Sequence, residues 1–246
     1  MAGHSHWAKI KRAKAGNDAK RGRIWSKLAR RIIVAAKCGG GKPEENLQLR
    51  YAIDEAKAAN MPKDTIEKAI KKGAGELGAE NYEEVVYEGY GPGGVAVMVE
   101  CLTDNRNRTA PELRQIFERA GGQLGATNAV AWMFERKGTF AVSADAADED
   151  TLMEAALEAG ADDVELDEDT WEITCQVAAF SEVKEALAAR RIETLSGEIA
   201  MVPNTMADVP EDKVSQVIHL IDALEDNDDV QNVYANFVPP EGATAG

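Results

Sequence analysis

The 246-residue sequence lacks several features that would assign it to a familiar class of protein. It has no apolar run long enough to cross a membrane, and no apolar signal-peptide core precedes a small-residue cleavage site near its start. Its three cysteines, Cys38, Cys101 and Cys175, are far apart and form no CxxC pair. This scattered, odd-numbered set argues against a disulfide framework and a structural zinc site, and it indicates a reducing, cytoplasmic setting.

Recognisable catalytic and ligand-binding motifs are also missing. There is no GxSxG stretch and no cysteine with an evident histidine partner, and the acidic runs in residues 144–169 do not match a calcium loop. The stretch GYGPGG lacks the phosphate-loop pattern and predicts a tight turn. We therefore expect no catalytic residue, metal, cofactor or small-molecule substrate. An enzyme whose carboxylates meet only on folding stays an alternative.

Acidic residues are nearly absent from the first 42 positions, although the whole chain has a formal net charge of −15. This segment contains twelve Lys or Arg and one Asp, a net +11, whereas residues 43–246 carry a net −26. Solvated helix faces normally interleave both signs, so a uniform sign predicts contact with a polyanion. The acidic remainder would repel that polyanion and confine binding to one end. The Arg-rich start is also similar in composition to a mitochondrial transit peptide, which stays an alternative.

The cations and rings of this basic segment are the candidate contacts with nucleic acid. Lys and Arg can neutralise phosphates, and flat rings beside them suit stacking on unpaired bases. Trp25 lies within a predicted helix and is expected to pack in its core, whereas Trp7 could stack or pack. His4 and His6 lack further metal ligands nearby, which favours surface or phosphate contacts. The predicted contact set is His4, His6, Trp7, Lys9, Lys11, Arg12, Lys14, Lys20, Arg21, Arg23, Lys27, Arg30 and Arg31.

A second candidate anion site lies in TDNRNRT, residues 103–109. It places Arg106 and Arg108 in a loop that enters a helix, and two arginines beside free N–H groups suit a phosphate or carboxylate. The alternative is that both arginines pair with local acids, and the sequence leaves the two open. Thr109, with Glu112 three residues later, predicts the cap of this helix.

The spacing of apolar residues predicts an all-helical N-terminal domain over residues 1–77. Its helices are expected at residues 23–41, 43–60 and 62–73, where apolar side chains recur at intervals of three and four. Asn, Gly and Pro residues mark the ends of these segments. The domain contains few large apolar side chains, so we expect its stability to depend on contacts with the neighbouring domains.

The remainder of the chain predicts two α+β domains. Residues 137–204 follow the order βαββαβ, the ferredoxin-like split βαβ pattern, and form an inserted domain. Residues 78–136 and 205–240 together form the domain that receives it, with a third strand expected over residues 129–138. The tail, residues 241–246, is expected to be disordered. The predicted fold class is therefore α+β with three domains, one of the two α+β domains being inserted in the other.

Four long blocks of the sequence resemble the YebC/PmpR family, which also includes an organellar translational activator of cytochrome c oxidase subunit I. The resemblance runs from Gly3 to about Phe237. The usual opening has Lys where this chain has His6. The blocks are GHSHWAKIKRAKAGNDAKRGRIWSKLARRI, AIDEAKAANMPKDTIEKAIKKG, YEGYGPGGVAVMVECLTDNRNRT and GGQLGATNAVAWMFERKG.

The resemblance implies a three-domain, cytoplasmic, non-enzymatic regulator of gene expression. Members are assigned as DNA-binding transcriptional regulators, and others resemble translation factors that act on the ribosome and relieve stalling. The partner implied is thus DNA or ribosomal RNA. The sequence shows no clear helix that would read bases in a DNA groove, and a unique RNA site would not need such a helix. A monomer is favoured, and no membrane partner is expected. The family's basic surface corresponds here to Lys9, Lys11, Arg12, Lys14, Lys20, Arg21, Arg23, Arg30 and Arg31.

Overall fold

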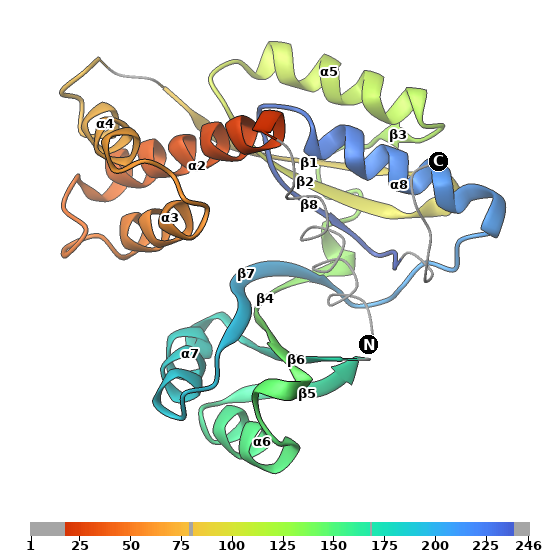
Figure 1. The fold of residues 1–246 in the computed structure, drawn as a ribbon. Helices are drawn as coiled ribbons and strands as arrows, with labels where there is room; N and C mark the ends of the chain where they lie inside the picture. Colours follow the sequence, from red (N-terminus) through yellow and green to blue (C-terminus); the bar gives the residue numbers. More distant parts are fainter. Residues whose placement is uncertain (1–17, 79–80, 168, 239–246) are drawn as a thin grey trace.

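The computed structural model describes residues 18–78, 81–167 and 169–238 (Figure 1). Within them a group of three helices is followed by two four-stranded antiparallel sheets with helices of their own. This arrangement confirms the predicted α+β class. No helix in the described ranges is both long enough and apolar enough to cross a bilayer.

The helical group packs around one apolar cluster. Its elements are α2 (Asp18–Gly39), α3 (Leu47–Ala58) and α4 (Lys63–Gly73). Ile32 of α2 is fully buried between the other two helices. Gly73 permits a close approach of α4 to α2, because a Cβ there would lie 2.4 Å from the carbonyl oxygen of Ile33. Trp25 packs against this cluster and donates its indole N–H to the Ala59 carbonyl at 3.0 Å, which confirms its predicted packing role.

Two of the predicted helix starts need correction. Helix α2 already begins at Asp18, five residues before the predicted start at residue 23. Helix α3 begins at Leu47 rather than residue 43, because the Asn46 side chain caps it by accepting the Leu49 N–H at 3.0 Å. The same Asn46 donates to carbonyl groups at the end of α2, and this ties the two helices together.

The first sheet has the strand order β3-β1-β2-β8, with every pair antiparallel. Helices α5 and α8 lie side by side over one of its faces (Figure 1). Leu113, Phe117 and Leu220 of these helices are fully buried against strand residues such as Val97 and Val99. The expected tight turn, GYGPGG, joins β1 to β2 through the short 3₁₀ helix η1 (Pro92–Gly94). The elements are β1 (Glu83–Tyr90), β2 (Ala96–Thr103), α5 (Arg106–Arg119), β3 (Gln123–Leu124), α8 (Glu211–Glu225) and β8 (Val230–Ala235).

The second sheet has the order β5-β6-β4-β7 and is also fully antiparallel. Its chain order is βαββαβ, with α6 and α7 packed on one face over a core that includes Phe140, Ile173 and Leu187. The elements are β4 (Phe134–Ser143), η3 (Ala144–Ala146), α6 (Glu149–Glu158), β5 (Ala161–Asp167), β6 (Thr170–Gln176), η4 (Val177–Ala179), α7 (Phe180–Ala189) and β7 (Thr194–Pro203).

The third strand predicted over residues 129–138 is wrong. Its first part is a loop and the short 3₁₀ helix η2 (Ala131–Met133), and β4 belongs wholly to the second sheet. The buried carboxylate of Glu88 holds this loop, because it accepts N–H groups from Asn128, Val130 and Ala131 at 2.7–2.8 Å. Most of the apolar residues that suggested a strand pack between the two sheets instead, whereas Trp132 is exposed. The predicted domain boundaries stay a prediction.

Candidate nucleic-acid interface

The structure describes the side chains of six residues predicted to bind nucleic acid or anions. Arg23, Lys27, Arg30 and Arg31 lie on α2, and Arg106 and Arg108 lie in the first turn of α5. Only the backbone of Lys20 and Arg21 is described, as part of α2. The other predicted contacts lie outside the described residues: His4, His6, Trp7, Lys9, Lys11, Arg12 and Lys14.

The basic side of α2 contacts the connection between α8 and β8, residues 226–229, which we call the acidic turn. Figure 1 shows the N-terminal end of α2 against this connection. Arg23 forms an ion pair with Asp226, with 2.5 Å between Nη1 and Oδ1. One helical turn later, Lys27 donates from Nζ to the carbonyl oxygen of Glu225 at 2.6 Å. These bonds join the helical group to the first sheet.

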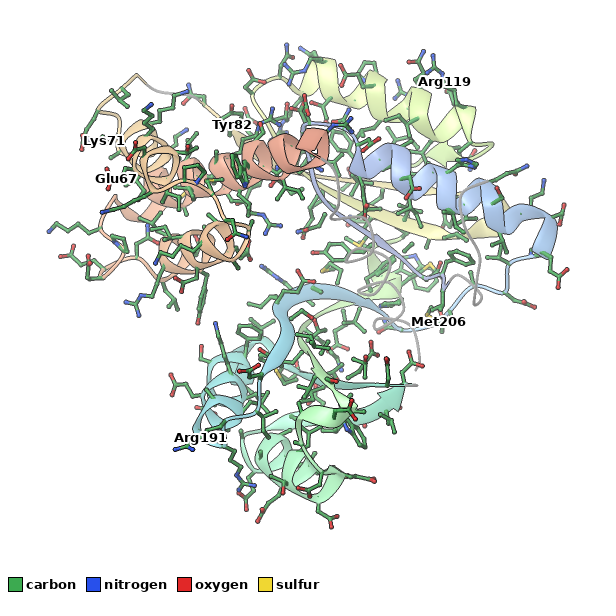
Figure 2. All side chains as sticks on the ribbon, in the orientation of Figure 1. Glu67, Lys71, Tyr82, Arg119, Arg191 and Met206 are labelled. Carbon is green, nitrogen blue, oxygen red and sulfur yellow. The ribbon has the colours of Figure 1, made fainter. Side chains whose placement is uncertain are left out.

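Arg30 makes the most buried of these contacts. It donates to the carbonyl oxygen of Asp228 and, over 3.0 Å, to Oδ1 of Asp229. Its guanidinium also lies 5.5 Å from the centre of the Tyr82 ring, close enough for a cation–π contact. Figure 2 shows Tyr82 beside α2. Arg30 is therefore held by both the acidic turn and the segment that leads into β1.

Arg31 links three elements. Its Nη1 donates to Oε2 of Glu55 on α3 at 2.7 Å, and its Nη2 donates to Oδ1 of Asn232 on β8 at 2.8 Å. Asn232 in turn donates to Glu100 of β2 at 2.9 Å. This cation therefore acts within the protein, as a bridge from the helical group to the first sheet.

Asp229 is the centre of the contact, and its side chain is only 3% exposed. Its Oδ2 accepts hydrogen bonds from Arg108 and Thr109, both at 2.7 Å, and from Thr103 at 3.2 Å. Burial by itself would raise the pKa of this carboxyl, but hydrogen bonds from Arg108 and Thr109 and the charges of Arg108 and Arg30 hold it below its ordinary value. Asp229 is thus an ionised acid that binds arginines from two parts of the fold.

The start of α5 explains the position of Arg108. Asn105 caps the helix, because its side chain accepts the N–H of Asn107 at 3.1 Å and that of Arg108 at 3.2 Å. The predicted cap, Thr109, instead lies inside the helix, where its hydroxyl is buried against Asp229. Arg108 also bonds to Asp104, one turn earlier, at 2.9 Å.

The structure does not bring Arg106 and Arg108 together at one anion site. Arg106 pairs with Glu83 at 2.6 Å, whereas Arg108 turns to the acids around the acidic turn. Both arginines thus have local acidic partners, the arrangement that the sequence left open as the alternative. A polar pocket of about 620 Å³ is lined by three arginines, four acids and one amide: Arg23, Arg30, Arg108, Glu112, Asp226, Asn227, Asp228 and Asp229.

The contact between α2 and the acidic turn is the feature of this interface that sequence reasoning missed. The run EDNDD, residues 225–229, is visible as a cluster of acids. Nothing in its spacing indicates that it meets a helix from the start of the chain, because that contact depends on how separate parts of the fold dock.

Within the described ranges, no group of three or more His, Cys, Asp or Glu side chains is placed to hold a metal ion.

Comparison with known proteins gives consistent matches over nearly the whole chain. Residues 5–76 match the family model for the TACO1/YebC protein N-terminal domain, and residues 82–237 match that for the TACO1/YebC second and third domain. A probable transcriptional regulatory protein of Pelotomaculum thermopropionicum is 54% identical over 96% of this chain and 98% of its own. One of the same description from Treponema denticola is 52% identical over 98% of each chain.

A solved structure shows the same fold. The crystal structure of a conserved hypothetical protein from Aquifex aeolicus is 49% identical in sequence and superposes with a TM-score of 0.84. The match covers 94% of this chain and 96% of that one. The family models, the sequence relatives and the solved structure therefore agree, and the chain belongs to the TACO1/YebC family.

Proposed function

We propose that this protein is a cytoplasmic, non-enzymatic regulator of gene expression that binds nucleic acid through its basic N-terminal segment. The observation that carries the proposal is the charge segregation, a net +11 over the first 42 residues against −26 over the rest. Such a field orients a polyanion toward one end of the molecule. The regulatory role is supported by relatives described as probable transcriptional regulatory proteins.

The first contacts with phosphate are assigned to the part of the segment before Arg23. The cations on the described part of α2 already bind carboxylates and carbonyl oxygens of the protein, so a phosphate would compete with these partners. Trp7 and the two histidines near it would stack on or contact exposed nucleotides. The proposed primary contacts are His4, His6, Trp7, Lys9, Lys11, Arg12, Lys14, Lys20 and Arg21.

Duplex DNA is the target that the descriptions of the relatives favour, and ribosomal RNA is the second candidate. The contacts of α2 favour the second. A helix that reads bases presents its polar side chains to the major groove, whereas Arg23, Lys27 and Arg30 bond to the protein's own acidic turn or to the adjoining Glu225. A basic segment that enters a phosphate-lined RNA site needs no such helix, because shape and unpaired bases supply specificity. In this second role the protein would act on the ribosome and relieve stalled translation.

A competition experiment distinguishes the two targets. Labelled protein is offered purified ribosomes together with an excess of promoter-containing duplex DNA, at about 0.15 M salt. Association with the ribosomes assigns the protein to translation, and preference for particular promoters assigns it to transcription. Binding to neither would reject the proposed function.

Charge-reversal variants locate the binding segment in the same assay. Changing Lys9, Lys11 and Arg12 to Glu should weaken binding by more than about tenfold, because three phosphate contacts become repulsive. The matched control changes three exposed lysines of α4 to Glu: Lys63, Lys68 and Lys71. Figure 2 shows Lys71 on the outer side of the helical group, away from the acidic turn. Equal losses in the two variants would mean that overall charge, and not this segment, sets the affinity.

A further inference from the structure

Helix α2 carries cations that can pair either with the acidic turn or with nucleic-acid phosphates. Arg23, Lys27 and Arg30 belong to the predicted nucleic-acid contacts, and each bonds to the acidic turn or to the adjoining Glu225. Their N–H groups point at carboxylate and carbonyl oxygens, the same kind of acceptor that a phosphate offers. A phosphate that approaches these groups therefore competes with the turn for their N–H donors and their charge.

We propose that the acidic turn, residues 226–229, competes with nucleic-acid phosphates for the cations of α2. When the basic segment binds its target, these cations exchange the turn for phosphates. This inference rests on the proposed function, since it concerns the regulation of the same site. In the closed state the turn places Asp226, Asp228 and Asp229 beside the basic side of α2, where their charges also repel an approaching phosphate. The first encounter is then assigned to the contacts proposed above for the part of the segment before Arg23.

The outer part of the contact, the pair of Arg23 and Asp226, is of a kind that can exchange, whereas Arg30 and Asp229 are more buried. The side chains of Arg23 and Asp226 are 44% and 66% exposed, and ion pairs that water can reach are individually weak. Ile24, on the same part of the helix, is 41% exposed, so it adds little apolar burial to the contact. A polyanion with a high density of phosphate charge, which also releases its condensed counterions, can compete with such pairs.

The acidic turn keeps its shape without help from α2. The Asp229 N–H donates to the Asn227 side chain at 2.9 Å, and the Asp229 carbonyl accepts the Leu102 N–H at 2.8 Å. The Asp229 carboxylate is also held by the hydroxyls of Thr103 and Thr109. Because these bonds lie within the first sheet and its helices, release of α2 separates two formed surfaces and does not require the turn to unfold.

Affinity measurements on a turn variant test the proposal. Changing Asp226 and Asp228 to Asn should tighten binding of ribosomes or duplex DNA by about two- to fivefold, because the competitor loses two charges. Glu149→Gln with Asp150→Asn, on exposed positions of α6 in the second sheet's unit, removes the same two charges far from α2 and is the matched control. An unchanged affinity, or an equal gain in the control, overturns the proposal.

A distance measurement tests the exchange directly. Spin labels on Lys71→Cys and Arg119→Cys, in a Cys38→Ser background because Cys38 is exposed, lie on either side of the contact (Figure 2). The proposal requires that nucleic acid lengthen or broaden the label-to-label distance, and an unchanged distribution overturns it. The proposed function has a separate test. It is rejected if the variant in which Lys9, Lys11 and Arg12 are changed to Glu binds nucleic acid as tightly as the unaltered protein.

Discussion

The two ends of helix α2 are held by different forces. Its C-terminal part buries Ile32 and Ala36 against α3 and α4, whereas the acidic turn and the adjoining Glu225 bond to three earlier residues, Arg23, Lys27 and Arg30. Apolar burial depends little on salt or on pH, but the ionic contact depends on both. The apolar end therefore fixes the fold of the helical group, and the charged end sets how that group sits on the first sheet.

The largest effect should come from the apolar end. Ile32→Ala removes a fully buried side chain and should lower the free energy of unfolding by about 3 kcal/mol, through lost burial and the cavity left behind. Ile24→Ala, two helical turns earlier at a position 41% exposed, should cost less than about 0.5 kcal/mol. Denaturant unfolding followed by circular dichroism measures both. Similar losses would show that the two ends of α2 are not held differently.

The next effect should come from the charged end, and it should depend on burial. Asp229→Ala removes the shared acceptor of Arg30, Arg108 and two hydroxyls, and should cost about 2–3 kcal/mol. Asp226→Ala removes only an exposed partner of Arg23 and should cost less than about 1 kcal/mol.

The effect of Asp229→Ala should also depend on pH. Because the folded pKa of Asp229 is lowered, its stabilisation is present above the unfolded value, about 3.9, and is lost as the pH falls through the folded pKa. The difference in unfolding free energy between the unaltered protein and Asp229→Ala should be constant from about pH 7 to 5 and shrink below about pH 4. A difference that does not change with pH would mean that Asp229 acts by packing alone.

The sequence predicted those features that depend on local spacing. The three helices of the N-terminal group, the βαββαβ order of the second sheet and the packing of Trp25 follow from apolar periodicity and turn residues, and the structure contains them. Even there the pattern is incomplete, since Ile24 shares the spacing of Leu28 and Ile32 yet is 41% exposed.

Features that depend on distant contacts were not predictable. The apolar run at residues 129–134 resembles a strand, but two of its N–H groups, and that of the preceding Asn128, bond to the buried Glu88 of β1. Most of its side chains, Trp132 excepted, pack in the apolar cluster between the sheets. Likewise, Arg30 meets Asp229 only when the helical group docks on the first sheet, and Arg108 meets it only when α5 packs beside the connection between α8 and β8. A sequence shows that such acids exist, but it does not show what they will touch.

The most direct measurement of the central claim is the salt dependence of nucleic-acid binding. The unaltered protein is compared with a variant carrying Ala at Lys9, Lys11 and Arg12, and with a control carrying Ala at three α4 lysines, Lys63, Lys68 and Lys71. If the basic segment binds phosphates, the slope of log K against log salt should become shallower by about 2–3 in the first variant and stay unchanged in the control. The same slope in all three proteins would contradict the account.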